Sequence, residues 1–116
     1  AIAKVHGRHG FFVNFEGLTV KSLEDIARLR ALFEAKLAPL GRRVYAIVNY
    51  DNVELGPAAE EIFFAMVRDS TEKYFLSATH YSTNAFFRHQ LGERFTQAQL
   101  GQAIYPSFEA ARKGMR

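Results

Sequence analysis

Residues 44–48, Val-Tyr-Ala-Ile-Val, form an apolar run that lacks the alternation of polar and apolar positions seen in a half-exposed strand. Segments with the helical spacing of apolar residues flank this run on both sides. A continuous apolar strand between helices is typical of a parallel sheet that is covered on both faces. This stretch therefore limits the fold to the α/β class.

The first flanking segment predicts a helix that begins after Ser22, with Asp25 completing a capping signature, and ends at Gly41. Its predicted inward positions are Ile26, Leu29, Leu32, Phe33, Leu37 and Leu40. The second helix is predicted to start at Gly56-Pro57, since proline suits a first turn. Its predicted buried residues are Ile62, Phe63, Met66, Val67 and Tyr74.

The remaining elements follow from similar patterns. Strands are predicted at 11–15, with Phe11, Val13 and Phe15 on one face and Phe12 on the other, at 18–20 and at 74–81. Ser82 or Thr83 is expected to cap a third helix, and Ser107 a short terminal one. The inward positions of the third helix are expected to be Phe86, Phe87, Leu91 and Phe95.

Strands that alternate with helices predict a single α/β domain with a mostly parallel, four- to five-stranded sheet and three to four helices. The length of 116 residues is that of one domain. We expect the domain to cover residues 10–116, and residues 1–9 to be a flexible approach segment.

The net charge of +3 does not indicate a nucleic-acid partner, because the excess of basic residues lies near the ends of the chain. Five of the fifteen basic residues are in the terminal segments, which leaves ten against all twelve acidic ones between residues 10 and 110. Nucleic-acid binding needs a clustered basic surface. Neither a nucleic acid nor a membrane is therefore expected as a partner, since no apolar run approaches the roughly 20 residues of a membrane span.

Cofactor and metal signals are missing from the sequence. The chain has no cysteine, and its glycines form no phosphate-binding or dinucleotide-binding motif. The histidine pairs His6/His9 and His80/His89 do not have the spacing of a zinc site on a helix. We expect no metal and no cofactor, and the lack of cysteine fits a cytoplasmic protein.

Polar residues follow two of the predicted strands at their carboxyl ends, where ligands usually bind in an open α/β sheet. If these strands are neighbours, one rim holds Asn49, Tyr50, Asp51, Asn52, His80, Tyr81, Ser82 and Thr83. A structural interpretation is also open, since Asn, Asp, Ser and Thr form turns and caps. A triad of Ser82, His80 and Asp51 is conceivable, but no G-x-S-x-G motif supports it, so no catalytic residue is assigned.

The aromatic content points to a protein interface. Eleven phenylalanines and five tyrosines are many for a small core. Adjacent residues of a helix cannot share one face, so one member of Phe63-Phe64 and one of Phe86-Phe87 should point away from the sheet. We expect Phe64 and Phe87 to mark a partner surface.

Two resemblances extend this interpretation. The predicted layout resembles the STAS family of anti-sigma-factor antagonists, and "AIYPSFEAARKGM" (103–115) is similar to the closing segment of those domains. Antagonists of that family carry a phosphorylatable Ser at the start of the helix after the central strand. The corresponding segment here, "DNVELGPAAEE" (51–61), has neither Ser nor Thr, so that switch is not implied.

Four segments are similar to the C-terminal extension of large bacterial acyl-CoA:acetate/3-ketoacid CoA-transferases. They are "VNFEGLTVKSLEDI" (13–26), "GRRVYAIVNYDNVEL" (41–55), "AMVRDSTEKYF" (65–75) and "HYSTNAFFRHQLGE" (80–93). The catalytic glutamate of that family lies in transferase domains that this chain does not contain. The resemblance implies a non-catalytic accessory module that packs on the parent transferase domains or forms a homo-oligomer such as a dimer.

Two other functions stay open at this point. One is a free-standing STAS-like regulatory binding domain whose small-molecule ligand is unknown. The other is a small enzyme that uses His80 and Asp51.

Overall fold

The structure is a computed structural model that describes residues 2–5, 10–97 and 104–114. Its larger sheet has five strands in the order β1-β2-β4-β6-β7. Strand β1 is antiparallel to β2, and the pairs β2–β4, β4–β6 and β6–β7 are all parallel. Strands β3 and β5 form a separate two-stranded parallel sheet. The predicted α/β class with a mostly parallel sheet is thus confirmed.

The elements alternate along the chain as the apolar pattern predicts. In chain order they are β1 (Ile2–Val5), β2 (Gly10–Asn14), β3 (Thr19–Val20), α1 (Leu23–Leu37), the 3-10 helix η1 (Ala38–Leu40), β4 (Val44–Asn49), β5 (Glu54–Leu55), α2 (Pro57–Tyr74), β6 (Phe75–Tyr81), α3 (Ala85–Gln97), β7 (Ile104–Tyr105) and α4 (Phe108–Gly114).

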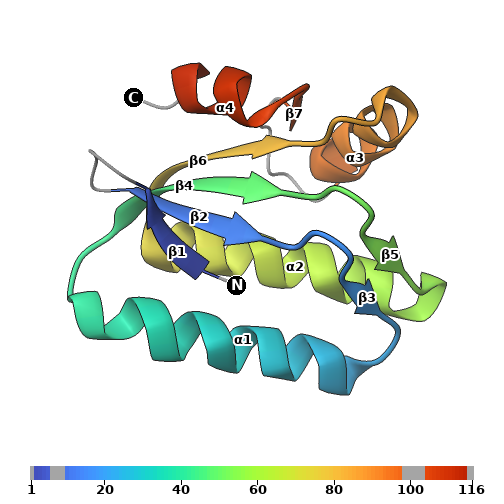
Figure 1. Ribbon diagram of the computed structural model, residues 1–116. Helices are drawn as coiled ribbons and strands as arrows, with labels where there is room; N and C mark the ends of the chain where they lie inside the picture. The colour runs from blue at the N-terminus through green and yellow to red at the C-terminus, as the bar shows by residue number, and fades with distance from the viewer. Residues whose placement is uncertain (1, 6–9, 98–103, 115–116) are drawn as a thin grey trace.

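Helices cover the main sheet unequally. Helices α1 and α2 lie on one face, and the short α4 lies on the other, above β6 (Figure 1). Helix α3 and the loop leading into α2 lie beyond the arrowheads of β4 and β6, at the carboxyl ends of the parallel strands (Figure 1). That end of the sheet is where α/β proteins of this kind bind ligands.

The core lies between the sheet and the pair α1 and α2. Strand β2 sends Val13 into it, and Phe15 follows directly after the strand, while Phe12 packs on the opposite face against Phe108, as predicted. The Phe15 ring makes edge-to-face contacts with Phe33 and Phe63, at centroid distances of 6.1 and 5.9 Å. Such pairs stabilise a core beyond the area that they bury.

The start of α1 confirms the predicted cap at Ser22, but α1 ends at Leu37, and the predicted Gly41 instead ends the 3-10 helix η1 that follows. The amide of Asp25 donates to the Ser22 hydroxyl at 3.3 Å, and the Asp25 carboxylate accepts from the Lys21 amide at 3.0 Å. The Lys21 amide is the main reason that the pKa of Asp25 lies below its usual value. Gly41 ends the segment with φ 66°, a left-handed conformation that glycine adopts without strain.

Several predictions about single positions are wrong. Leu32 and Ile62 were expected inside but are 37% and 39% exposed, because each lies at the edge of its helix's apolar stripe. The cap of α3 is Asn84, whose side-chain oxygen accepts from the Phe87 amide at 2.9 Å; Ser82 and Thr83 bond elsewhere.

The amino-terminal segment also departs from expectation. Residues 2–5 fall in the predicted flexible segment but form β1, which pairs with β2 in the register Ile2↔Val13 to Val5↔Gly10. Four residues are too few for a clear pattern of alternation, so the pairing with β2 decides their conformation. Residues 6–9 lie outside the described part of the chain.

Candidate functional site

The two predicted groups of polar residues do share one rim. Strands β4 and β6 are parallel neighbours in the register Asn49↔Tyr81, and the Tyr50 amide donates to the Tyr81 carbonyl oxygen at 3.0 Å. The carboxyl ends of both strands therefore lie side by side. We call residues 49–52 and 80–83 the polar rim.

Asp51 is the centre of the polar rim. One carboxylate oxygen accepts from the Ser82 hydroxyl at 3.0 Å and from the Thr83 amide at 2.7 Å. The other accepts from the Thr83 hydroxyl at 3.1 Å. Because its oxygens are engaged by these donors, the carboxylate ties the end of β4 to the end of β6.

Asn49 extends this network to β2. Its side-chain oxygen accepts from the Asp51 amide at 2.9 Å, and its side-chain nitrogen donates to the Asn14 side-chain oxygen at 3.1 Å. The Glu16 amide donates to the same Asn14 oxygen at 3.0 Å. The Asn49 amide thus connects the ends of β2 and β4, and at 4% exposure it does not face a ligand.

The aromatic members of the polar rim point into the core. His80 is 1% exposed, and its ring centroid lies 5.5 Å from Tyr50 and 4.7 Å from Phe95. Tyr50 is completely buried, and this burial raises the pKa of its phenol far above the ordinary value. Burial also raises the pKa of Tyr81, with smaller contributions from the carboxylates of Asp51 and Glu16.

Little of the polar rim is open to solvent. Asn52 and Thr83 are exposed and Asp51 is half-buried, whereas the other five residues are buried. Asn52 has φ 57°, and asparagine is one of the few residues that tolerates this conformation in a turn. The structure thus brings the predicted residues together as an internal network of hydrogen bonds.

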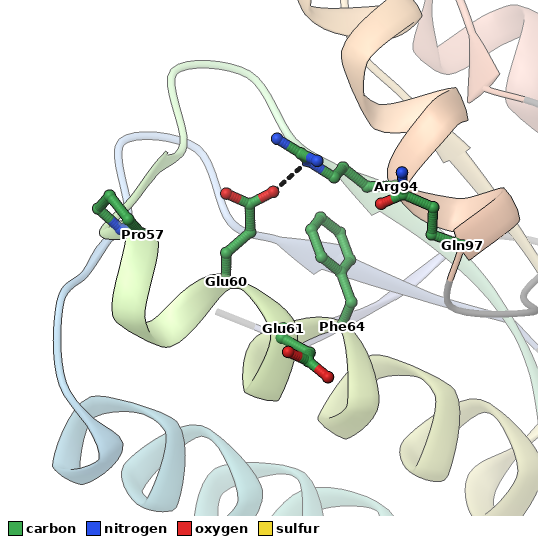
Figure 2. A pocket seen from close by; sticks show the side chains of 6 residues that line it. All are labelled: Pro57, Glu60, Glu61, Phe64, Arg94 and Gln97. Atoms are coloured by element: carbon green, nitrogen blue, oxygen red, sulfur yellow. Dashed lines mark ion pairs between the residues drawn. The ribbon is translucent and has the colours of Figure 1, made fainter.

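A more open site lies next to the polar rim, between α2 and α3 (Figure 2). One part, of about 400 Å³, is lined by Pro57, Glu60, Glu61, Phe64, Arg94 and Gln97. An adjoining part of about 180 Å³ shares Glu60, Phe64 and Arg94 and adds Leu55, Phe87, Gln90 and Leu91. We call the two parts together the α2–α3 groove.

An ion pair between Glu60 and Arg94 spans the groove (Figure 2). The Glu60 side chain is 25% exposed and that of Arg94 47%, so the pair lies at the groove surface. Below it, the Phe64 ring points toward α3 and contacts Phe95 edge to face, with 5.7 Å between centroids. The groove thus has an aromatic floor and charged edges.

The predicted orientation of the paired phenylalanines is half right. Phe64 was expected to point outward, but it is 4% exposed, because α3 covers it. In the second pair one residue does face solvent, but it is Phe86, at 73% exposure, and not the half-buried Phe87. Phe64 and Phe87 both line the α2–α3 groove.

The charged residues at the edges of the groove are hard to predict from the sequence. Glu60 and Arg94 are 34 positions apart, and each is an ordinary charged residue on a helix. Only their spacing from Phe64 and Leu91, four and three positions away on the same helices, indicates that they border an apolar strip.

The described part of the chain has no group of three His, Asp or Glu side chains placed to bind a metal ion. Within the same residues, no helix combines the length and the apolar character that crossing a bilayer requires. Comparison of the chain with protein-family models, with curated proteins and with solved structures gives no match. Fold and site together define an α/β domain with a hydrogen-bonded polar rim and a groove between two helices.

Proposed function

We propose that this domain is a non-catalytic docking module of an acyl-CoA (acetate/3-ketoacid) CoA-transferase, which packs on the parent transferase domains or on a second copy of itself. Support for the family comes from the four segments quoted above, which resemble the C-terminal extension of those enzymes. Support for docking comes from the surface around α3.

The exposed Phe86 is the observation that carries the proposal. Its side chain is 73% exposed, although a phenylalanine that leaves water gains about 1.5–3 kcal/mol. Gln90 lies four residues further along α3, so the two side chains are neighbours on the helix surface. Because Gln90 lines the α2–α3 groove, Phe86 adds apolar surface to its border.

The polar rim supports a non-catalytic role. A general base needs access to a substrate, but His80 is enclosed by aromatic rings and the Asp51 carboxylate is engaged by Ser82 and Thr83. These contacts explain the polar residues as structural. The alternative of a small enzyme based on His80 and Asp51 therefore gains no support from the geometry.

A free-standing STAS-like regulatory binding domain is the second candidate. Its support is the mostly parallel sheet with α1 and α2 on one face, which is of the α/β class that the resemblance implies. Helix α2 begins at Pro57 after the N-cap Gly56, and residues 51–61 contain no Ser or Thr, so a hydroxyl for phosphorylation is missing from its start. This candidate would bind a partner without that switch.

The proposal is tested by measuring association. The purified chain is analysed by size-exclusion chromatography with light scattering over a range of concentrations, and by retention on immobilised acyl-CoA transferase domains. We expect self-association or retention, and we expect Phe86→Ser to weaken it. Leu76→Ser is the matched control, since Leu76 is 56% exposed but lies near the other end of β6.

A wild-type chain that stays monomeric and is not retained would refute the proposal, as would equal effects of Phe86→Ser and Leu76→Ser. Retention on transferase domains favours the first candidate. Self-association without retention favours the module that pairs with its own copy.

A further inference from the structure

Both walls of the α2–α3 groove are helix faces. The lining residues of α2, Pro57, Glu60, Glu61 and Phe64, are spaced at i, i+3, i+4 and i+7. Those of α3, Phe87, Gln90, Leu91, Arg94 and Gln97, continue the same spacing for one more turn. Side chains at this spacing form ridges along a helix, and the trough between two such ridges accepts the ridge of a third helix.

The size of the groove sets the length of its occupant. From Phe87 to Gln97 the α3 wall spans ten residue steps, which is about 15 Å at the rise of an α-helix. A segment of about three helical turns fits this length. Among the lining residues only Leu55 belongs to a strand, the two-residue β5, so an added β-strand would find at most a very short backbone edge there.

The occupant must be amphipathic. The floor is apolar and contains Leu55, Phe64, Phe87 and Leu91. Because Phe64 and Leu91 are 4% and 2% exposed, the accessible apolar surface comes from Leu55, Phe87 and the exposed Phe86, which lies one turn before Gln90 on α3. The edges contain charged and amide side chains. A helix with apolar residues at i, i+3 or i+4, and i+7 covers such a floor and keeps its polar face in water.

The charge of the groove specifies one edge of the occupant. Arg94 neutralises Glu60, whereas Glu61 is exposed and forms no ion pair within the described residues. Gln90 and Gln97 contribute hydrogen-bonding groups without charge. The groove therefore has a net negative charge on its α2 side, which complements a lysine or arginine.

We propose that the α2–α3 groove binds one amphipathic α-helix of a partner protein, with its apolar face on Phe86 and Phe87 and a basic residue opposite Glu61. This inference rests on the proposed docking function and specifies the element of the partner that is recognised. An anionic ligand, including a nucleic acid, is disfavoured by the same unpaired carboxylate.

The test uses two stapled helical peptides of about 15 residues, long enough to cover the groove. Both carry leucine at the same i, i+3, i+4 and i+7 positions, and they differ only in lysine or glutamate along one edge. Binding to the whole 116-residue chain is measured by fluorescence anisotropy. We expect the lysine peptide to bind roughly fivefold more tightly, the combined effect of one exposed attraction and one exposed repulsion.

Charge reversal gives the decisive comparison. Glu61→Lys is expected to reverse the order of the two peptides, and Glu61→Gln to make them nearly equal. Glu72→Lys is the matched control, because Glu72 is an exposed residue of α2 that does not line the groove. It should leave the preference for the lysine peptide intact, and circular dichroism verifies that each variant is folded.

Equal binding of both peptides, or a preference that Glu61→Lys leaves unchanged, would overturn the inference. If Phe86→Ser abolishes association while the peptides are not distinguished, docking stands and the helical partner is wrong. If the peptides are distinguished but the chain neither self-associates nor binds transferase domains, the proposed function is wrong and the groove inference stands.

Discussion

Replacing Asp51 by alanine should destabilise the domain, because its carboxylate connects the ends of two core strands. The bond from the buried Ser82 hydroxyl is the most important of the three, since Ser82 is 0% exposed and loses the acceptor for its proton. A hydrogen bond between a charged and a buried group contributes about 2 kcal/mol. The two bonds from Thr83 are exposed to water, so we assign them about 0.5 kcal/mol each.

The expected loss for Asp51→Ala is therefore about 3 kcal/mol, a large part of the roughly 5–15 kcal/mol that stabilises a domain. Asp51→Asn keeps the oxygen that accepts from Ser82 and from the Thr83 amide, and it should lose only about 1 kcal/mol. At about 4 °C per kcal/mol for a chain of this size, Tm should fall by about 12 °C and about 4 °C respectively. Thermal unfolding followed by circular dichroism measures both.

Asp69→Ala is the matched control for the loss of a carboxylate. Asp69 pairs with Arg30 and Arg68 on the surface, where its side chain is 50% exposed, so its removal should change stability by less than about 1 kcal/mol. An Asp51→Ala variant as stable as the wild type, or more stable, would refute the structural interpretation. Such an outcome is common for residues of active sites and would return Asp51 to the candidates for ligand binding.

Three further substitutions test the local physics of the fold. Tyr50→Phe removes a buried hydroxyl that has no hydrogen-bond partner among the described residues, so urea unfolding should show a gain of about 1 kcal/mol; a loss would contradict the assignment. Burial raises the folded-state pKa of Tyr50, so the neutral phenol contributes fully to the free energy of unfolding below about pH 10. Above that pH the free energy of unfolding should fall by about 1.4 kcal/mol per pH unit. Between about pH 9 and pH 11 it should therefore fall less for Tyr50→Phe than for the wild type. Gly41→Ala places a side chain at φ 66° and should lower the free energy of unfolding by about 1 kcal/mol; an unchanged Tm would exclude strain there. Ser22→Ala should cost about 1 kcal/mol through the lost cap of α1, whereas Ser77→Ala, at a half-buried position of β6 that caps no helix, serves as the comparison.

The order of elements, the cap at the start of α1 and the turn at Gly41 could be predicted because their causes are local. Ser22, Asp25 and Gly41 act within a few residues of their own positions, and the run from Val44 to Val48 carries its own evidence of burial. The closeness of Asp51 and Ser82 also followed, since parallel neighbouring strands end at the same edge of a sheet.

The accessibility of the site residues could not be predicted, because it depends on which helix covers them. Phe64 and Phe86 each belong to a pair of adjacent phenylalanines, yet α3 buries the first and leaves the second in solvent. The position of α3 is a tertiary property that no local pattern specifies. The Glu60–Arg94 ion pair depends on that same position of α3, so neither the ion pair nor the groove could be predicted from the sequence.

Arg88 connects helix α3 to the polar rim. Its guanidinium donates to the Ser82 carbonyl oxygen at 2.8 Å, and the Ser82 hydroxyl in turn bonds Asp51. These bonds hold α3 against the carboxyl ends of β4 and β6 and so help to position the α3 wall of the α2–α3 groove, although none of the three residues lines it. Substitutions of Arg88, Ser82 or Asp51 should therefore change the width of the α2–α3 groove without changing any residue that lines it.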